Sequence, residues 1–563
     1  MNIYLFLNKL LNIKKVRILV IFFVIILGII RIVSCYSVFS HTVDEPAHIA
    51  CGMEFLSTGS YTIEYQHPPL TRVMMAIGPY LYGIRSTWDM FKHNEGIVPP
   101  MWQEGLSLLS QKDYKLTLTL ARVGNLFFYA IACLATYLIS SSYYGYLVGI
   151  LSVFIFSFNP EILGQSGLAM TDMGVTAFMG LSIFSFHSWI KSPNILKTLI
   201  LSVMISLSFL AKFTALMFLP LFFLSQSVVY YLNEKKDGNI SSFSVWVLSY
   251  CRWLPLFFLV MFLSIWTGYG FSLNPLFDTG SSKVIALIKQ HVDGHLNIQN
   301  YIIYLINAPI WPLREFIGGI LSVIGHNNVG HSVYFLGMIS SYGWWYYFPT
   351  VLFIKTSLTL WLLSTIGIFS LLKIFKDKEK DYNFFVPIVI SIAILISVMP
   401  SNLNLGVRHI LIIYILLSPL STLGFLFLIK RNTIMCNAIG VLILFAFIFF
   451  SFLSHPNYLS FRNALFKTNP ENYLVEMDMG QDFNLLLSRL ETIDAKSVAI
   501  DCQGHWRHVD PLFPAYAIED FTKAEYIAIS LRQLALFPEK SKLLDKFSKV
   551  ELIGTSIMLY KRN

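Results

Sequence analysis

The sequence predicts an α-helical polytopic membrane protein that ends in a small α/β domain outside the membrane. Hydrophobic residues make up 55% of the 563 residues and charged residues only 13%, whereas a soluble domain carries about 25% charged residues. Apolar stretches of about 20 residues, the length that crosses the hydrocarbon core of a bilayer, recur as far as Leu453. They stop there, which predicts a transmembrane domain over residues 1–453 and a soluble domain over 454–563.

The apolar stretches predict about eleven transmembrane helices. They lie near Val16–Phe39, Leu116–Ile139, Tyr146–Phe158, Met173–Ile190, Ile195–Leu210, Phe213–Tyr231, Val247–Trp266, Tyr347–Phe375, Phe384–Met399, Ile410–Leu428 and Ile434–Leu453.

Basic residues between these stretches predict the orientation of the chain. Lys14, Lys235 and Lys430, with the other cations near them, all fall on one side of the membrane if the N-terminus is cytoplasmic. An odd number of spans then places the C-terminal domain outside. The formal charge of +9 belongs to these loops instead of forming one basic face. No nucleic-acid partner is therefore predicted.

Two of the predicted outer loops, residues 40–115 and 267–346, are long, and long loops in a compact protein usually carry function. The first contains an amphipathic stretch, Pro69–Tyr82, which predicts a short helix in the membrane interface. In the soluble domain the pattern predicts a helix at Phe483–Leu490. Strands are predicted at Ser497–Ile500 and Ser556–Tyr560.

Two adjacent carboxylates, Asp44 and Glu45, follow the first predicted span and stand directly before Pro46. Asp and Glu are favoured at helix starts and Pro at the first helical position, so the pair also suits a simple helix cap. With His48 the spacing resembles the H-E-x-x-H zinc motif. A proline there would break the helical turn on which both metal ligands of that motif lie. The cap and a chemical role both remain open.

Other ionisable residues fall on the same predicted outer face. Asp172 opens the fourth span, where it is equally suited to cap the helix. Arg122 and Arg408 open the second and tenth spans, and cations at that depth either snorkel or bind an anionic lipid head group. His67 and Arg72 flank a Pro-Pro turn, which suits a phosphate site or an ordinary loop.

Lys355 lies deeper, inside the eighth predicted span. Ionisable residues within the bilayer are candidates for function, because an unpaired charge there is costly. Pairing with an acid or with carbonyls at a helix end is the alternative.

Carboxylates and cations on one membrane face suit the transfer of a sugar from a lipid phosphate. The leaving group is a phosphate anion, which cations stabilise, and the incoming hydroxyl needs a carboxylate to take its proton. Displacement in line at the anomeric carbon inverts its configuration and requires a single base.

Several motifs occur in an order that resembles a known family. They are Asp44-Glu45 followed by Gly52, Gly59, Tyr61 and His67-Pro68-Pro69-Leu70; Ala121-Arg122; Thr171-Asp172; Gly343-Trp344-Trp345-Tyr346-Tyr347-Phe348-Pro349 with Lys355; Asn404-Leu405-Gly406-Val407-Arg408-His409; and Asp478-Met479-Gly480-Gln481-Asp482. The chain thereby resembles the GT-C glycosyltransferases. Within them it is similar to the glycosyltransferase 39-like branch, which includes protein O-mannosyltransferases and lipid A aminoarabinose transferases.

This resemblance implies a GT-C fold, a polyprenyl-phosphate sugar donor and Asp44 as the catalytic base, with Glu45 and Asp172 as further catalytic candidates. It implies donor phosphate or lipid binding by His67, Arg72, Arg122, Lys355 and Arg408. In aminoarabinose transferases a lysine associated with the donor phosphate precedes the proline of the first-loop motif, and His67 holds that place here. Metal dependence varies within the group, so no metal is predicted.

The function predicted is a membrane glycosyltransferase of a bacterial inner membrane whose acceptor is lipid A, another glycan or a protein hydroxyl. A transporter or lipid flippase that uses the same charges without covalent chemistry is the alternative. Broken helices and internal two-fold repeats would favour transport, and the sequence shows neither.

Overall fold

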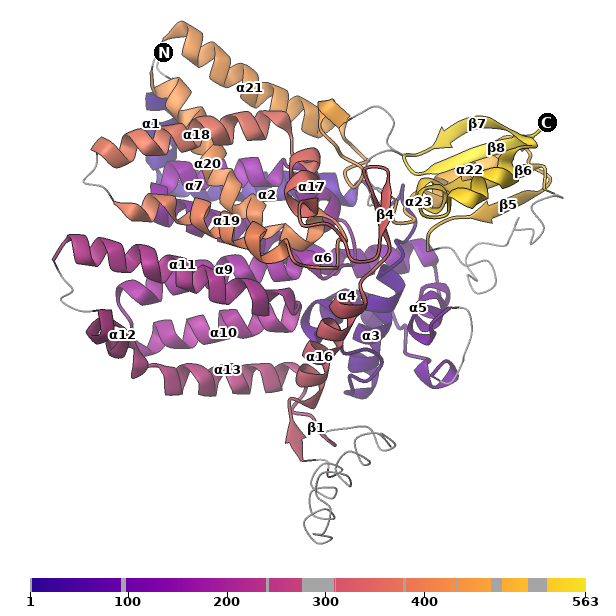
Figure 1. Ribbon diagram of the computed structural model, residues 1–563, viewed down its shortest axis with the longest axis horizontal. Coiled ribbons are helices and arrows are strands. Elements are labelled where there is room, and N and C mark those ends of the chain that lie inside the picture. Colours follow the sequence, from indigo (N-terminus) through magenta and orange to yellow (C-terminus); the bar gives the residue numbers. More distant parts are fainter. Residues whose placement is uncertain are drawn as a thin grey trace.

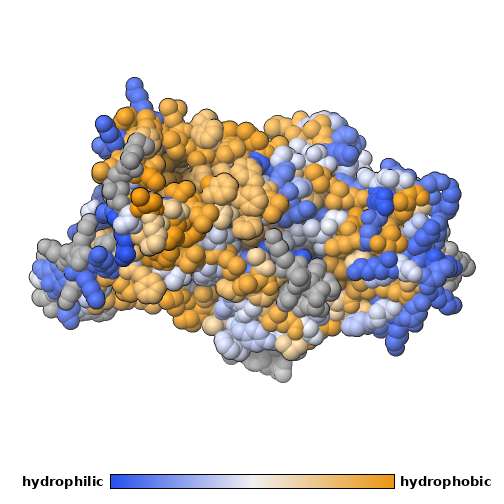
Figure 2. Space-filling view, turned by 90° about the horizontal axis from the view of Figure 1, so that it is seen from above, coloured by the Kyte–Doolittle hydropathy of each residue, from blue (hydrophilic) through white to orange (hydrophobic). Residues whose placement is uncertain are grey.

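The computed structural model describes residues 3–92, 98–238, 243–275, 308, 310–377, 381–431, 433–466, 478–504 and 524–563. Within them the chain is mostly helical, and the long helices run side by side along the length of the molecule (Figure 1). The N-terminal helix and the C-terminal sheet lie at opposite ends of these helices. The surface in Figure 2 is apolar over its middle, and hydrophilic residues gather at the two ends, as expected of a protein embedded in a bilayer.

In the part of the chain that the structure describes, six helices are long and apolar enough to cross a membrane. They are α2 (Lys14–Val33), α6 (Tyr114–Tyr144), α9 (Asp172–Lys191), α11 (Thr214–Lys236), α20 (Ile412–Lys430) and α21 (Ile434–Leu453). Two bent pairs raise the number to eight if each is one span: α7 (Tyr146–Ser157) with α8 (Pro160–Ser166), at 66°, and α17 (Tyr347–Lys355) with α18 (Leu358–Asp377), at 109°. The protein is thus an integral membrane protein.

The other predicted spans correspond to helices shorter than a full membrane crossing. These are α10 (Ile195–Ala211), α13 (Leu254–Gly268) and α19 (Val386–Val398). The predicted spans are therefore helical. Fewer than eleven of them are long and apolar enough to cross a membrane as one helix.

The prediction of one straight helix over Tyr347–Phe375 is wrong, because the helix turns sharply after Lys355. Asn463 explains the turn. Its backbone amide donates to the carbonyl of Ile354 at 2.9 Å, and its side-chain amide donates to the carbonyls of Phe353 and Thr356. Carbonyls at the end of α17 are thereby satisfied without a continuing helix. The expectation that the spans are unbroken is likewise wrong.

Shorter helices cover one end of the membrane helices. They are α3 (Glu45–Thr58), α4 (Pro69–Leu81), α5 (Pro100–Ser110) and α16 (Arg314–Val329). The predicted helix over Pro69–Tyr82 is confirmed as α4. Helices α3 and α4 approach closely at Gly52, where an added Cβ would lie 2.1 Å from the Arg72 carbonyl oxygen. A larger residue there would push apart the two helices that carry much of the first loop.

The remaining small elements connect these helices. They are α1 (Ile3–Asn12), α12 (Phe243–Cys251), the paired strands β1 (Leu273–Asn274) and β2 (Trp311–Pro312), the hairpin β3 (Val333–Phe335) and β4 (Met338–Ser340), and the 3₁₀ turns Trp88–Met90, Tyr382–Phe385, Val407–Ile410, Ala464–Phe466 and Pro538–Leu544. Part of the predicted loop 267–346 lies outside the described residues.

The segment after α21 forms the predicted small α/β unit. Helix α22 (Phe483–Thr492) packs on a four-stranded sheet of order β5-β6-β8-β7, with β5 (Val498–Asp501), β6 (Tyr526–Ser530), β7 (Phe547–Ile553) and β8 (Ile557–Arg562). Strands β5 and β6 are parallel, and the other pairs are antiparallel. Helix α23 (Leu531–Leu536) follows β6 directly. The helix and both strands predicted from the sequence are confirmed.

Backbone hydrogen bonds join this unit to the start of the first loop. Ser40 donates its amide to the Gln481 carbonyl at 3.0 Å, and Val43 donates its amide to the Met479 carbonyl at 2.9 Å. The Ser40 hydroxyl lies 2.9 Å from the Gly480 carbonyl. The residues just before Asp44 are therefore held by the C-terminal unit.

Candidate active site

A cavity of about 1030 Å³ lies where the first loop, the ends of the membrane helices and the C-terminal unit meet. Of the eight site residues predicted from the sequence, some line this cavity and others do not. Five of them line it: Asp44, His67, Arg72, Asp172 and Arg408. Glu45, Arg122 and Lys355 are not among the lining residues.

Asp44 stands at the edge of this cavity, directly before α3. Its side chain is 30% exposed, and its Oδ2 lies 3.2 Å from Nη1 of Arg408. Asp44 occupies the N-cap position of α3, as the cap interpretation has it, but its carboxylate makes no capping hydrogen bond to the helix. The backbone around it is fixed, since Trp102 donates its indole N–H to the Val43 carbonyl at 2.7 Å. The carboxylate is thus anchored at its base and accessible at its tip.

Glu45, the next residue, is sealed inside the protein. Its side chain is 0% exposed and forms a two-pronged ion pair with Arg122, with Nε to Oε1 and Nη2 to Oε2 both at 2.8 Å. The amides of Thr42 and Ala169 also donate to it at 2.7 Å. Although burial opposes ionisation, Arg122 and these donors lower the pKa of the Glu45 carboxyl, which is therefore charged. This pair joins the first loop to α6 and to the residues before α9.

Asp172 forms the second carboxylate of the cavity, at the start of α9. Its Oδ1 lies 2.5 Å from Nζ of Lys212, the residue that links α10 to α11. Its Oδ2 is buried and has no hydrogen-bond partner among the described residues. Thr171 occupies the N-cap position of α9, as the cap interpretation allows, but its side chain makes no capping hydrogen bond.

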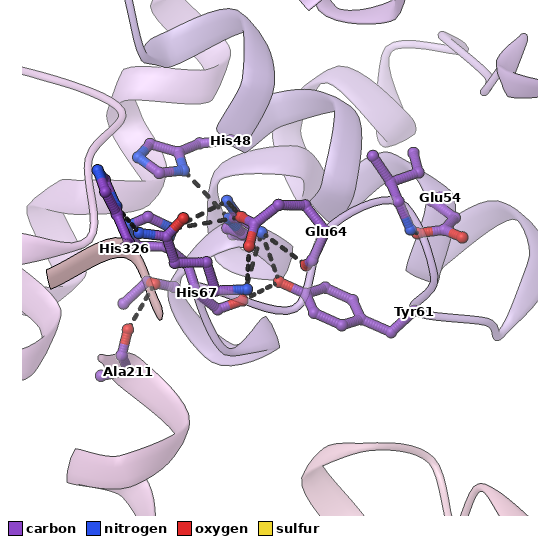
Figure 3. A network of polar contacts seen from close by, with 11 residues as sticks. His48, Glu54, Tyr61, Glu64, His67, Ala211 and His326 are labelled. Atoms are coloured by element: carbon purple, nitrogen blue, oxygen red, sulfur yellow. Dashed lines mark hydrogen bonds and ion pairs between the residues drawn. The ribbon is translucent and has the colours of Figure 1, made fainter. Parts of the chain in front are cut away.

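Arg72 is held by several residues of the first loop, and Figure 3 labels His48, Tyr61 and Glu64 among them. Its Nε donates to Nδ1 of His48 at 3.1 Å and its Nη1 to the Tyr61 hydroxyl at 2.9 Å. Its Nη2 pairs with Glu64 and lies 3.2 Å from Nδ1 of His67. The guanidinium is 1% exposed. Arg72 therefore organises the first loop, and its donors are already occupied.

The two titratable neighbours of Arg72 have shifted pKa values. Burial opposes the ionisation of Glu64, yet Arg72 and the hydrogen bond from His67 lower the pKa of this carboxyl to about 2. Burial lowers the pKa of His67, against the attraction of Glu64. Because the ordinary pKa of histidine is already below 7, His67 is neutral at pH 7. A neutral imidazole offers no positive charge to an anionic ligand.

Lys355 pairs with an acid, as its alternative interpretation predicted. Its Nζ lies 3.3 Å from Oε2 of Glu161 and donates to the Leu459 carbonyl at 2.5 Å. Both ionic partners are buried, and they lie at the two helix breaks, Glu161 in α8 and Lys355 at the end of α17. This ion pair thus joins the two bent helix pairs.

The cavity residues that were missed as site candidates include Lys212, His409 and Arg532. Lys212 had a usable signal, because it is a lone lysine in a two-residue link on the predicted outer side, where loop cations are disfavoured. His409 stands beside Arg408 in a motif that the sequence does single out. Arg532 belongs to the tail that resembles no motif, and nothing in the sequence marks it.

One wall of the cavity is apolar, and some of its side chains are also exposed on the surface of the molecule. Helices α11, α16 and α19 supply Leu216, Met217, Ile320, Val323, Ile324 and Val398 to this wall. Met217 is 39% exposed and Ile324 is 53% exposed. The cavity is therefore bordered by side chains that also face outward, so a lipid chain has an apolar route into it.

The described residues contain no group of three or more His, Cys, Asp or Glu side chains placed to hold a metal ion. The carboxylates of the cavity are each paired with a cation instead: Asp44 with Arg408, Glu64 with Arg72, and Asp172 with Lys212.

No family model and no curated protein matches the chain. Among solved structures it is similar to ArnT from Cupriavidus metallidurans bound to undecaprenyl phosphate, at 11% identity and a TM-score of 0.47, over 96% of this chain and 97% of that one. It is also similar to an oligosaccharyltransferase of Archaeoglobus fulgidus tethered with an acceptor peptide, at 11% identity and a TM-score of 0.48, over 98% and 74%.

Both proteins have the GT-C fold. At this identity and TM-score the likeness carries no argument, and the function proposed below rests on the cavity.

Proposed function

We propose that the protein transfers a sugar from a polyprenyl-phosphate carrier to a hydroxyl acceptor on the outer side of the membrane. The observation that carries this proposal is the cavity itself. Ion pairs at Asp44 and Asp172 stand in it beside an apolar wall, some of whose side chains are also exposed on the surface of the molecule. A substrate with an apolar chain, an anionic link and a polar sugar matches these surroundings in order.

Asp44 is the catalytic base of the proposed reaction. The acceptor oxygen attacks the anomeric carbon and forms a new C–O bond, and its proton passes to the Asp44 carboxylate. The bond between that carbon and the phosphate oxygen breaks, and the polyprenyl phosphate leaves with the electron pair. The configuration at the anomeric carbon is inverted. Asp44 suits this role because its carboxylate is accessible while its backbone is fixed.

Arg408 and Lys212 hold the phosphate in this proposal. Both line the cavity, and each is balanced by a carboxylate when no donor is bound. Phosphate is a strong acceptor for guanidinium and ammonium donors, which form short charge-assisted hydrogen bonds with it. The free Oδ2 of Asp172 suits a sugar hydroxyl or an acceptor hydroxyl beside the phosphate.

The cavity is supported by buried residues that do not line it, namely Glu45, Arg122 and Lys355. Their ion pairs are buried and do not line the cavity. The Glu45–Arg122 pair holds the residue next to Asp44 against α6, so its role is to position the base. His67 and Arg72 build the first loop in the same way.

The location of the reaction follows from the orientation predicted by the loop charges. We propose that the N-terminus is cytoplasmic and that the cavity and the C-terminal unit lie on the outer side of a bacterial inner membrane. The donor sugar is a hexose or pentose unit, and the acceptor is lipid A, a glycan or a protein hydroxyl.

A transporter or flippase is the second candidate, because the two bent helix pairs are a feature of transporters. The helix breaks, however, are closed by the Glu161–Lys355 pair and by Asn463, none of which lines the cavity. The charged residues that do line the cavity are carboxylates and cations, which sugar transfer needs as a base and as phosphate-binding groups.

Mass spectrometry of envelope lipids, glycans and glycoproteins, from cells with and without this protein, tests the proposal. Sugar transfer predicts that one sugar disappears from its acceptor while its polyprenyl-phosphate form accumulates. Transport without chemistry predicts that the acceptor keeps its composition and that a lipid changes leaflet. An unchanged set of sugar-bearing molecules would refute the transferase.

A further inference from the structure

The C-terminal unit contributes residues to the cavity. Met479, Gln503 and Arg532 are among its lining residues. Met479 belongs to the turn that holds Val43, and Gln503 follows β5. Arg532 lies at the start of α23, immediately after β6. The unit is therefore a wall of the site as well as an appended domain.

Arg532 is held by its backbone more than by its side chain. Its amide lies 3.4 Å from Oδ2 of Asp478. Its Nε is buried and has no hydrogen-bond partner among the described residues. Burial lowers the pKa of Arg532, against the attraction of Asp478 and Asp44, and the charge of Arg408 acts in the same direction as burial. An arginine remains charged in proteins even so.

This arrangement differs from that of the other cavity cations. Arg72, Lys212 and Arg408 each have a carboxylate within ion-pair distance of the side chain. For Arg532 no such ion pair is found in the described part of the chain. A buried N–H without an acceptor is unfavourable, so a cavity lined by such a group is suited to an anionic ligand.

We propose that Arg532 is a phosphate-binding residue that the C-terminal unit brings into the cavity, so that it acts together with Arg408 on the phosphate of the bound ligand. A guanidinium presents several N–H groups in one plane, which suits phosphate oxygens. With the proposed function as its basis, the ligand is the carrier phosphate. The same chemistry would also hold free phosphate.

The contacts between the C-terminal unit and the first loop give this arrangement its geometry. The turn at 479–481 pairs with Ser40 and Val43, so β6 and Arg532 are attached to the segment that carries Asp44. An added Cβ on Gly504 would lie 3.0 Å from Cα of Val43, which shows how closely the two parts pack. The contacts between the turn at 479–481 and residues 40–43 therefore position both Asp44 and Arg532.

Binding of undecaprenyl phosphate and of inorganic phosphate to the purified full-length protein in detergent, by isothermal titration calorimetry, tests the proposal. Arg532→Gln keeps the size of the side chain and removes the charge. We expect it to weaken binding about ten- to hundred-fold, the size of a charge-assisted hydrogen bond. Arg532→Lys should recover part of the affinity.

Arg489→Gln is the matched control, because Arg489 lies in the same unit, is partly exposed, pairs with Glu551 and does not line the cavity. It should leave both affinities unchanged. Weaker binding of undecaprenyl phosphate alone supports the proposal and assigns the phosphate to the lipid. Weaker binding of both probes supports a phosphate site at Arg532 that accepts either source. Weakening of inorganic phosphate alone supports a site for free phosphate.

Equal affinities of the wild type and Arg532→Gln would overturn the proposal, as would an equal loss in Arg489→Gln. A wild type that binds neither probe would overturn it as well. Failure of the proposed function is recognised separately, by an envelope that does not change when the protein is removed. In that case an Arg532-dependent phosphate site would still stand.

Discussion

Asp44 and Glu45 are neighbours in the chain, yet their ion pairs lie in different surroundings. The Glu45–Arg122 pair is sealed, with side chains 0% and 2% exposed, and each carboxylate oxygen accepts from the guanidinium. The Asp44–Arg408 pair is open, with side chains 30% and 12% exposed and one contact at 3.2 Å. One peptide bond thus separates a structural carboxylate from an accessible one.

This difference in exposure indicates which ion pair can exchange its partner for a ligand. A sealed pair loses much if one partner is removed, because the other charge stays buried and uncompensated. In an open pair each partner can turn to solvent or to a ligand, so the pair is weak and available. Chemistry is therefore expected at Asp44 and stability at Glu45.

Replacing Asp44 by Asn gives the largest expected effect. The amide keeps the shape but cannot take a proton, so the transfer rate should fall about 10²- to 10⁴-fold. Transfer by the purified protein in liposomes measures it, with the donor and acceptor that the envelope comparison identifies. The melting temperature of the variant should stay close to that of the wild type. A variant that transfers at the wild-type rate would exclude Asp44 as the base.

Replacing Glu45 by Gln should act on stability instead. It leaves the Arg122 charge buried without its partner, which costs about 3–5 kcal/mol. Unfolding in detergent, followed by thermal denaturation, measures the loss. The double variant Glu45→Gln with Arg122→Met is the control, because it removes both charges and should recover part of the stability. If the single variant is as stable as the wild type, the contrast between the two pairs is lost.

Replacing Arg408 by Ala should weaken binding of the donor about 30- to 100-fold, with a smaller effect on the acceptor. The expected size is that of a lost hydrogen bond between charged groups. Separate KM values for donor and acceptor measure the two effects. Arg431→Ala, at an exposed cation of the α20–α21 link, serves as the control. Unchanged donor affinity would remove the phosphate role of Arg408.

The smallest expected effect concerns Asp478. Titration of its carboxyl should make the free energy of unfolding depend on pH. Burial raises the pKa of this carboxyl to about 6. Its stabilising contribution is fully present below its unfolded pKa of 3.8 and is lost as the pH rises through about 6. From pH 5 to pH 7 the protein should lose about 1 kcal/mol through this group.

Melting temperatures of the wild type and of Asp478→Asn across this pH range check the expectation. The variant, which has no group to titrate at that position, should lack the part of the pH dependence due to Asp478. Identical pH profiles of the two proteins would contradict it.

Much of the fold could be predicted from the sequence, because hydrophobic length alone locates membrane helices. The bend after Lys355 could not be predicted. It depends on Asn463, which is distant in the chain and reaches the carbonyls at the end of α17. Long-range side-chain contacts of this kind leave no local pattern.

The candidate site was predictable in its types of residue but not in its pairing. Loop charges place Asp44, Asp172 and Arg408 on one face, and the structure brings all three to one cavity. The family resemblance favours Asp44 over Glu45 as the base, but the local pattern could not show which of these two adjacent carboxylates is buried. Their burial decides between them, and burial depends on where α6 presents Arg122.

The measurement that tests the account most directly is photo-crosslinking with a diazirine-bearing polyprenyl phosphate, followed by mapping of the labelled peptides by mass spectrometry. The account predicts labels on the cavity wall, around Met217 of α11 and Ile320–Ile324 of α16, which excess undecaprenyl phosphate removes. Labels confined to the lipid-facing surfaces of α2 and α21, unaffected by that competitor, would contradict it.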